Sequence, residues 1–142
     1  MKAALIEAEK AFAEQEVPVG AVAVMGGEII AREHNRTLQL NDPTAHAEIL
    51  LLKKTSMITG NYRLSEVTIY VTLEPCPMCA GALIQGRVDR LVFGTPDQKG
   101  GGVVSKFGIL EAGKLNHDIP YLAGILKKPC RDIMQRFFCE RR

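Results

Sequence analysis

The sequence predicts an α/β domain of alternating strands and helices, and three observations support this fold class. Residues 2–14 repeat small and apolar side chains at helical spacing. Residues 67–73 form a β-branched run, which is typical of a strand. Two more helices are expected to start near Pro43 and Pro77, because proline suits the first helical turn. The length of 142 residues fits one domain, which we expect to span residues 1–142.

The N-terminal part of the chain is expected to form a helix followed by a hairpin. The helix over residues 2–14 should stop before Pro18, which cannot continue it. Residues 19–25 have the apolar character of a buried strand. The glycine pair at 26–27 is a two-residue turn of the hairpin type, so residues 28–35 should return as the paired strand.

The next helix is expected to begin near Asp42 and to run to about Thr55. Asp42 suits the N-cap position, and Pro43 suits the first turn. The middle of this helix, residues 49–52, is apolar on nearly all sides, which indicates burial on more than one face. In a small domain one face of such a helix can cover the sheet, so we expect a second subunit to cover the other.

Strands and helices continue to alternate in the second half of the chain. Pro75 and Pro77 should force a turn after the strand at 67–73. The helix after this turn has a surface of small residues that allows close approach to the preceding helix. The remaining expectations are a helix over 77–85, a strand over 91–93, a glycine-rich loop over 95–102, a weak helix over 104–112, a strand over 119–123 and a helix over 127–142.

The composition excludes some classes of protein. The chain has 46% hydrophobic and 24% charged residues and a net charge of +2, which is ordinary for a soluble domain. No apolar run approaches the ~20 residues that a membrane helix needs. Glu7 comes too early for a secretory signal peptide, so we expect a cytoplasmic protein. In a reducing compartment a CxxC pair is more often metal-binding or redox-active than a disulfide.

Such a pair, Cys76 and Cys79, is the main chemical signal of the sequence. Residues three apart share a helix face, and two thiolates suit a soft ion such as zinc. The pair alone leaves open half of a structural zinc site, a redox dithiol and part of a catalytic zinc site. Upstream, His46 offers a third ligand and Glu48 a carboxylate that can move protons. Three ligands and a base would leave a fourth metal position for water, as in catalytic sites.

His46 and Glu48 are two residues apart, and such residues do not share a helix face. They could still converge if the metal lies beyond the helix N-terminus, toward which Cα–Cβ bonds tilt. Zinc would lower the pKa of a bound water toward about 7, and Glu48 would take the proton and pass it on. This chemistry suits hydrolysis at an electron-poor carbon, such as a ring carbon that bears an amine.

Two interpretations of the Cys76–Cys79 pair without hydrolysis stay open at this point: a redox dithiol and a non-catalytic zinc or RNA-binding module. A thioredoxin-like dithiol has no use for His46 or Glu48. A non-catalytic zinc or RNA-binding module would not depend on Glu48. A structural zinc site needs a fourth ligand, and none of the candidates has close motif spacing: His34, His117, Cys130 and Cys139.

Short motifs spread over almost the whole chain become recognisable together. They are EVPVGAV at 16–22, NR at 35–36, DPTAHAE at 42–48, NYRL at 61–64, YVTLEPC at 70–76 and MCAGA at 78–82. With them the chain resembles the zinc-dependent nucleobase deaminases, and most closely the bacterial tRNA wobble adenosine deaminases. The resemblance implies a three-layer fold of the cytidine-deaminase type, with a central mixed sheet of five strands flanked by helices. It also implies a homodimer that binds RNA near the subunit boundary.

The resemblance also implies roles for single residues. His46, Cys76 and Cys79 would hold one zinc ion per subunit, and Glu48 would be the proton shuttle. Asn35 matches a residue that hydrogen-bonds the flipped base. The implied reaction converts the wobble adenosine of an arginine tRNA anticodon to inosine and releases ammonia. Deamination of a free base or nucleoside, such as cytidine or guanine, is the alternative, because zinc and a glutamate do not choose the ring.

The RNA-binding surface is expected to include the basic C-terminal run. Residues 127–142 contain six Lys or Arg and two acidic residues, and such charge supplies affinity for phosphates. Of the pair at 137–138, we expect one phenylalanine in the core and the other on RNA. The chain departs from the family at Val103 and Val104, where small residues are usual. Glu74 is expected only to brace the turn before Cys76. By resemblance and charge, the candidate RNA contacts are Asp97, Lys99, His117, Phe138 and Arg141.

Overall fold

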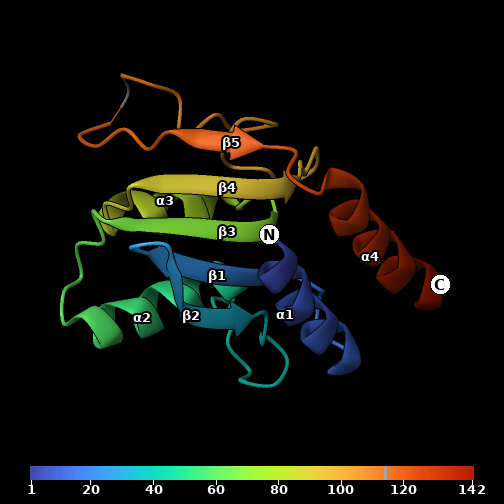
Figure 1. Ribbon diagram of the computed structural model, residues 1–142. Helices are drawn as coiled ribbons and strands as arrows, with labels where there is room; N and C mark the ends of the chain where they lie inside the picture. Colours follow the sequence, from blue (N-terminus) through green and yellow to red (C-terminus); the bar gives the residue numbers. More distant parts are fainter. Residues whose placement is uncertain (114) are drawn as a thin grey trace.

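In the computed structural model, which describes residues 1–113 and 115–142, one mixed sheet carries helices on both faces (Figure 1). The strand order within these residues is β2-β1-β3-β4-β5. β1 is antiparallel to β2 and β3, whereas β3, β4 and β5 are parallel. This confirms the α/β class and the mixed sheet of five strands. The elements are α1 (Lys2–Ala13), β1 (Gly20–Met25), β2 (Glu28–His34), α2 (Ala47–Thr59), β3 (Val67–Leu73), α3 (Pro77–Gln85), β4 (Arg90–Thr95), β5 (Tyr121–Ala123) and α4 (Lys127–Glu140).

Helix α1 lies unusually close to strand β1 because both contribute small residues. Ala4 and Ala8 of α1 are fully buried. A Cβ atom at Gly20 would lie 2.0 Å from the carbonyl oxygen of Ala4, so only glycine fits there. Successive strand residues point to opposite faces, and the next residue, Ala21, belongs to the main hydrophobic core. Helix α1 and the main core are therefore on opposite faces of the sheet.

The main core lies between the sheet and helices α2 and α3. Its fully buried members include Leu51 of α2, Leu83 of α3 and Phe93 of β4. Helix α4 packs beside α1, where the rings of Phe12 and Phe137 meet edge to face at 5.7 Å. Figure 1 shows α1 and α4 together at the end of the sheet toward which β3 and β4 run.

The predicted start of the second helix, near Asp42, is wrong. Helix α2 begins at Ala47, and His46 is its N-cap. The Asp42 carboxylate accepts hydrogen bonds from the Thr44 amide at 2.8 Å and from the Thr44 hydroxyl at 2.7 Å. This Asx turn satisfies locally the groups that would otherwise open a helix. The helix also continues beyond the predicted end at Thr55, to Thr59.

The weak helix expected over residues 104–112 is absent from this described stretch, which consists of turns. The amides of Val104 and Ser105 donate to the Glu74 carboxylate instead of to carbonyls of a helix. Gly108 has a φ of +61°, which a right-handed helix does not accommodate. The last strand is shorter than the expected 119–123, because Pro120 has no amide hydrogen to donate. The other predicted elements are confirmed to within a few residues.

Within residues 1–113 and 115–142, no helix combines the length and the apolarity that crossing a bilayer requires. The longest helix there, α4, has 14 residues, whereas a membrane span takes about 20.

Candidate metal centre and RNA-binding cleft

Two helix N-termini meet at the candidate metal centre. His46 is the N-cap of α2, with extended backbone angles of φ −71° and ψ 152°. Cys76 is the N-cap of α3, with φ −70° and ψ 172°, and Cys79 lies in the first turn. Pro77 fixes the start of α3, since its missing amide hydrogen costs nothing at that position. The peptide dipoles of both helices favour negative charge here.

The three side chains are close enough to share one ion. The Nδ1 atom of His46 lies 3.6 Å from the Sγ atom of Cys76 and 3.6 Å from that of Cys79. The three ligand atoms all lie within 4.8 Å of one another. A tetrahedral zinc ion with Zn–S near 2.3 Å and Zn–N near 2.05 Å separates sulfur and nitrogen by about 3.6 Å. The residues therefore fit zinc in both chemistry and spacing.

The site provides three protein ligands. Over the described ranges, 1–113 and 115–142, His46, Cys76 and Cys79 form the one group of three or more potential metal ligands. The residues that a structural site would need as a fourth ligand lie elsewhere. His34 bonds Glu7 and Glu14. Cys130 is a buried residue of α4, Cys139 is exposed, and His117 contacts Val88.

The cysteines share a proton unequally. A hydrogen bond from Cys79, together with one from His46, lowers the pKa of Cys76 to about 4. The hydrogen bond to Cys76 and burial raise the pKa of Cys79 far above its ordinary value. The hydrogen bond to Cys76 also raises the pKa of His46. A metal bound here would displace protons from these groups, because metal binding releases protons from its ligands.

Glu48 converges on this site, although it follows His46 by only two residues. The extended backbone at His46 frees its side chain from the helical face pattern. Glu48 lies inside α2, is 3% exposed, and is hydrogen-bonded to Cys79. Burial raises the pKa of Glu48 to about 7, which suits a group that both takes and gives protons near neutral pH. A cation held by His46, Cys76 and Cys79 would instead lower the pKa of Glu48.

Asn35 directly follows strand β2. It is buried, with 5% exposure, and its backbone amide donates to the Val19 carbonyl at 3.0 Å. The amide of the following residue, Arg36, donates to the carbonyl of Ala45 at 3.0 Å. This bond ties the end of β2 to the segment directly before His46. Backbone hydrogen bonds therefore connect the segment that holds Asn35 to the segment that leads into His46.

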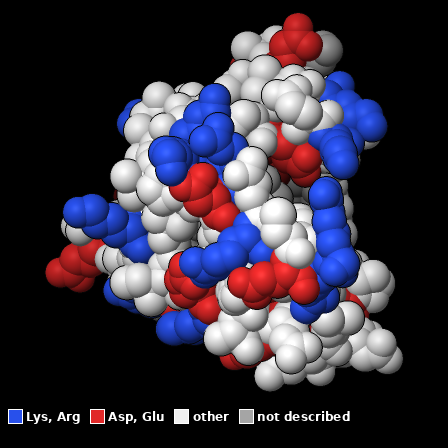
Figure 2. Space-filling view, turned by 90° about the vertical axis from the view of Figure 1, so that its right-hand side faces the viewer, with Lys and Arg blue, Asp and Glu red and all other residues white. Residues whose placement is uncertain are grey.

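The candidate RNA contacts fall into two groups. Asp97, Lys99, Phe138 and Arg141 line one cleft of about 1060 Å³. Its wall continues through Val17, Leu73, Met134 and the basic residues Arg131 and Arg142. Figure 2 shows this end of the molecule, where Lys and Arg side chains alternate with Asp and Glu.

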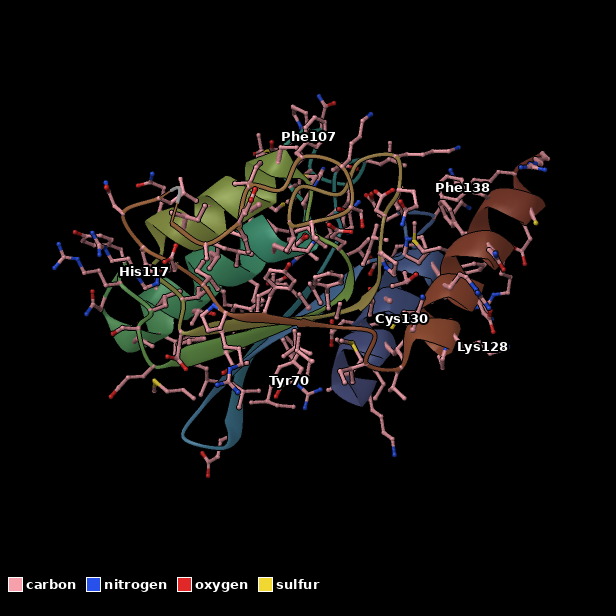
Figure 3. The ribbon with its side chains drawn as sticks, turned by 90° about the horizontal axis from the view of Figure 1, so that it is seen from above. Tyr70, Phe107, His117, Lys128, Cys130 and Phe138 are labelled. Atoms are coloured by element: carbon pink, nitrogen blue, oxygen red, sulfur yellow. The ribbon has the colours of Figure 1, made fainter. Side chains whose placement is uncertain are left out.

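His117 lies outside this cleft. Its Nε2 atom is 3.2 Å from the carbonyl oxygen of Val88, which precedes β4. The candidate ligand Cys76 follows the opposite, C-terminal end of β3, which runs parallel to β4. Figure 3 shows His117 and Phe138 at opposite ends of the molecule. Within one chain the structure does not bring His117 together with the other candidates.

Of the two phenylalanines of α4, one lies in the core, as expected, and the other is exposed. Phe137 is buried, whereas Phe138 is 49% exposed and faces the cleft. The guanidinium of Arg141 lies 4.0 Å from the centre of the Phe137 ring and donates to the carbonyl of Gln15 at 2.5 Å. These contacts fix the end of α4 against the loop that follows α1.

Glu74 is the residue whose importance the sequence did not reveal. Its carboxylate is 2% exposed and receives hydrogen bonds from Asp97, Val104 and Ser105. Burial alone would raise the pKa of Glu74, but these hydrogen bonds outweigh burial and hold the pKa below its ordinary value. The sequence does offer one indication of this role, because Glu74 is an isolated acidic residue between a buried strand and a Pro-Cys turn. A carboxylate buried at such a position needs hydrogen-bond donors from another part of the chain.

The fold and this site are those of a deaminase. The family model of MafB19-like deaminases matches residues 1–142. A tRNA-specific adenosine deaminase of Bacillus subtilis (strain 168) is 44% identical over 142 residues, which are 100% of this chain and 88% of the relative. The chain therefore belongs to the family of tRNA-specific adenosine deaminases.

Solved structures agree on the deaminase fold. A structure from work on A-to-I editing by tRNA:A34 deaminases at the wobble position of transfer RNA matches with a TM-score of 0.90 and 42% identity. The match covers 94% of this chain and 96% of that chain. A guanine deaminase from Bacillus subtilis matches with a TM-score of 0.67 and 30% identity, over 99% of this chain and 90% of that chain. The expected cytidine-deaminase-like fold is confirmed.

Proposed function

We propose that this protein is a zinc-dependent hydrolase that converts the wobble adenosine of an arginine tRNA anticodon to inosine. Water and adenosine are consumed, and inosine and ammonia are formed. The observation that carries the proposal is the cluster of His46, Cys76 and Cys79 with the buried carboxyl of Glu48 beside it. Family membership supports adenosine in tRNA as the substrate, since the Bacillus subtilis relative is a tRNA-specific adenosine deaminase.

His46, Cys76 and Cys79 would hold the zinc ion. When bound, zinc acts as a Lewis acid that makes water a nucleophile at neutral pH. Glu48 takes a proton from the attacking water and delivers it to a ring nitrogen of the adenine. It later takes the second proton of that water from the hydroxyl on the ring carbon and passes it to the amine, which leaves as ammonia. The burial of Glu48 keeps bulk water away from these transfers. Asn35 holds the flipped base by hydrogen bonds from the end of β2.

The cleft lined by Lys99, Phe138 and Arg141 suits the nucleotides around the target base. Lys99 and Arg141 supply positive charge for phosphates. The exposed ring of Phe138 offers a surface on which an unpaired base can stack. Asp97 shapes the loop that carries Lys99, because its Oδ1 atom accepts the amides of Lys99 and Gly100 at 3.0 and 3.1 Å.

The proposal includes a homodimer in the cytoplasm. Helix α2 supports the dimer, because Met57 and Ile58 are 84% and 54% exposed, and Ile49 and Leu50 are partly exposed. A reducing compartment keeps the thiolate ligands available. We place His117 near the anticodon only in such a dimer. Sedimentation velocity at micromolar concentration should give a dimer, and a monomer at every concentration would contradict this part of the proposal.

The decisive experiment is single-turnover deamination of an arginine tRNA transcript that carries adenosine at the wobble position. Free adenosine, cytidine and guanine are assayed in parallel, and a chelator-stripped sample is the metal control. We expect inosine in the tRNA alone, and only with zinc restored. Turnover of guanine or a free nucleoside with an inert tRNA would favour the free-base alternative, to which the similarity with guanine deaminase points. A zinc-loaded protein inert on every substrate would favour a non-catalytic module.

A further inference from the structure

A single buried carboxylate organises the loop that borders the metal centre. We call residues 97–105 the Glu74 loop. Within the described residues, the Glu74 carboxylate accepts four hydrogen bonds from it. The Oε2 atom accepts the Asp97 amide at 3.0 Å and the Ser105 hydroxyl. The Oε1 atom accepts the Val104 amide at 2.8 Å and the Ser105 amide at 2.9 Å. Both ends of the loop are thus held by the same side chain.

The Glu74 loop also lies directly on the turn that delivers Cys76. The amide of Gly102 donates to the carbonyl of Pro75 at 2.7 Å. A Cβ atom at Gly102 would lie 2.6 Å from the backbone nitrogen of Pro77, so the loop backbone touches the first turn of α3. Residues 74–76 therefore anchor both the loop and a metal ligand. Contacts between the loop and the metal centre run through this short segment.

The part of the loop that faces the cleft is the part that Glu74 fixes. Asp97 and Lys99 line the cleft opposite Phe138. Asp97 is held by Glu74 through its backbone amide, and its own side chain then orients the turn to Lys99 and Gly100. Val104, whose amide also donates to Glu74, is 51% exposed. Without the carboxylate, these backbone amides lose their partner and the loop loses its defined shape.

We propose that Glu74 is a positioning residue for RNA, which holds the Glu74 loop as one wall of the path for the single-stranded nucleotides beside the target base. This inference rests on the proposed function. The plainer role is to brace the turn before Cys76. The two roles differ in what they change: bracing alone affects metal affinity, whereas positioning affects RNA affinity while metal affinity stays the same.

Glu74→Gln tests the proposal, because it keeps the shape of the side chain and replaces one accepting oxygen by an NH₂ group that faces other donors. We expect its Kd for an anticodon-arm RNA, measured by fluorescence anisotropy at fixed salt, to rise at least about tenfold, the equivalent of one charge-assisted hydrogen bond. Zinc affinity and the single-turnover rate constant at saturating RNA should stay within about threefold, the range of a neutral substitution. Hydrogen exchange at the Val104 amide should accelerate. Glu66→Gln, at an exposed position, is the matched control.

A double-mutant cycle separates positioning from general destabilisation. Lys99→Ala should weaken RNA binding in the wild-type background and have much less effect with Glu74→Gln, because the lysine is already misplaced there. Ser105→Ala removes one hydrogen bond and keeps the carboxylate, so it should cause a smaller rise in Kd. If Glu74→Gln folds poorly, Ser105→Ala provides the test in its place.

Additive effects of Lys99→Ala and Glu74→Gln, an unchanged Kd, or a loss confined to zinc affinity would each overturn the positioning role. If the wild-type protein deaminates the RNA and Glu74→Gln leaves Kd and exchange unchanged, only this inference fails. If the wild-type protein deaminates free bases and binds no RNA, both the proposed function and this inference fail. Hydrogen exchange at the Val104 amide then still reports whether the Glu74 carboxylate holds the loop.

Discussion

Replacing Glu48 by glutamine should abolish turnover while leaving the metal centre assembled. The Glu48 side chain is 3% exposed inside the first turns of α2. Glutamine has nearly the same volume, so the packing around Leu51 and Leu52 should be kept. The amide cannot take or give a proton at neutral pH. The change therefore removes the proton transfers and little else.

The size of the loss follows from the surroundings of Glu48. A positioned general acid–base contributes about 10²–10⁴-fold to the rate. Glu74, which is also buried near Cys76, cannot take over, because both of its oxygens are occupied by the Glu74 loop. We therefore expect the upper part of the range, a loss of about 10³–10⁴-fold, or about 4–5 kcal/mol in the barrier.

The assay is single-turnover inosine formation with enzyme in excess over an anticodon-arm RNA. Zinc content by elemental analysis and RNA affinity by anisotropy should match those of the wild type. Glu66→Gln, an exposed exchange of the same kind, should leave all three quantities unchanged. A Glu48→Gln rate within about tenfold of wild type would refute the role of Glu48 as the proton carrier, since less than the smallest expected contribution would be lost.

Three further predictions follow from the geometry. Cys79→Ala should weaken zinc binding at least about 100-fold in a chelator competition, because a direct ligand is removed. Lys99→Ala should lower the slope of log Kd against log salt by about 1, as expected for one phosphate contact. Burial would raise the pKa of Glu7, but hydrogen bonds from Lys10 and His34 outweigh it and leave the pKa below 4.5. This carboxylate therefore stabilises the fold above pH ~4.5 and loses that contribution at lower pH. Glu7→Gln should lower the free energy of unfolding in urea at pH 7 and flatten its fall in acid.

The candidate metal site could be predicted because its signals are local. Cys76 and Cys79 are three residues apart at a proline-marked helix start, and His46 precedes another helix. Such spacings bring ligands together without knowledge of the rest of the fold. The strand at 67–73 and the basic C-terminal helix were predictable for the same reason, since their side-chain patterns lie within one element.

Boundaries and distant neighbours could not be predicted in this way. Asp42 and Pro43 have the composition of a helix start, but the Asx turn to Thr44 uses the carboxylate before any helix begins. The choice between these two structures depends on Ala45, which is fully buried and whose carbonyl accepts the Arg36 amide at 3.0 Å. A contact with a different segment thus moved the helix start from the predicted position to Ala47.

The metal centre is indicated by local residue spacing, whereas the Glu74 loop is shaped by contacts between residues far apart in the sequence. The loop has no periodic pattern, and the weak helix expected over 104–112 would have begun inside it. Its shape comes from hydrogen bonds to the carboxylate of Glu74, which lies far earlier in the sequence. The Val104 amide, for example, donates to Glu74 at 2.8 Å across 30 residues of sequence. The loop itself adds no metal ligand, and it meets the metal centre through backbone and one carboxylate. Substitutions at Gln98 and Lys99 leave in place the amides bound to Glu74 and the glycines that touch Glu74 and the turn before α3. They should therefore alter which RNA is bound and leave zinc affinity unchanged.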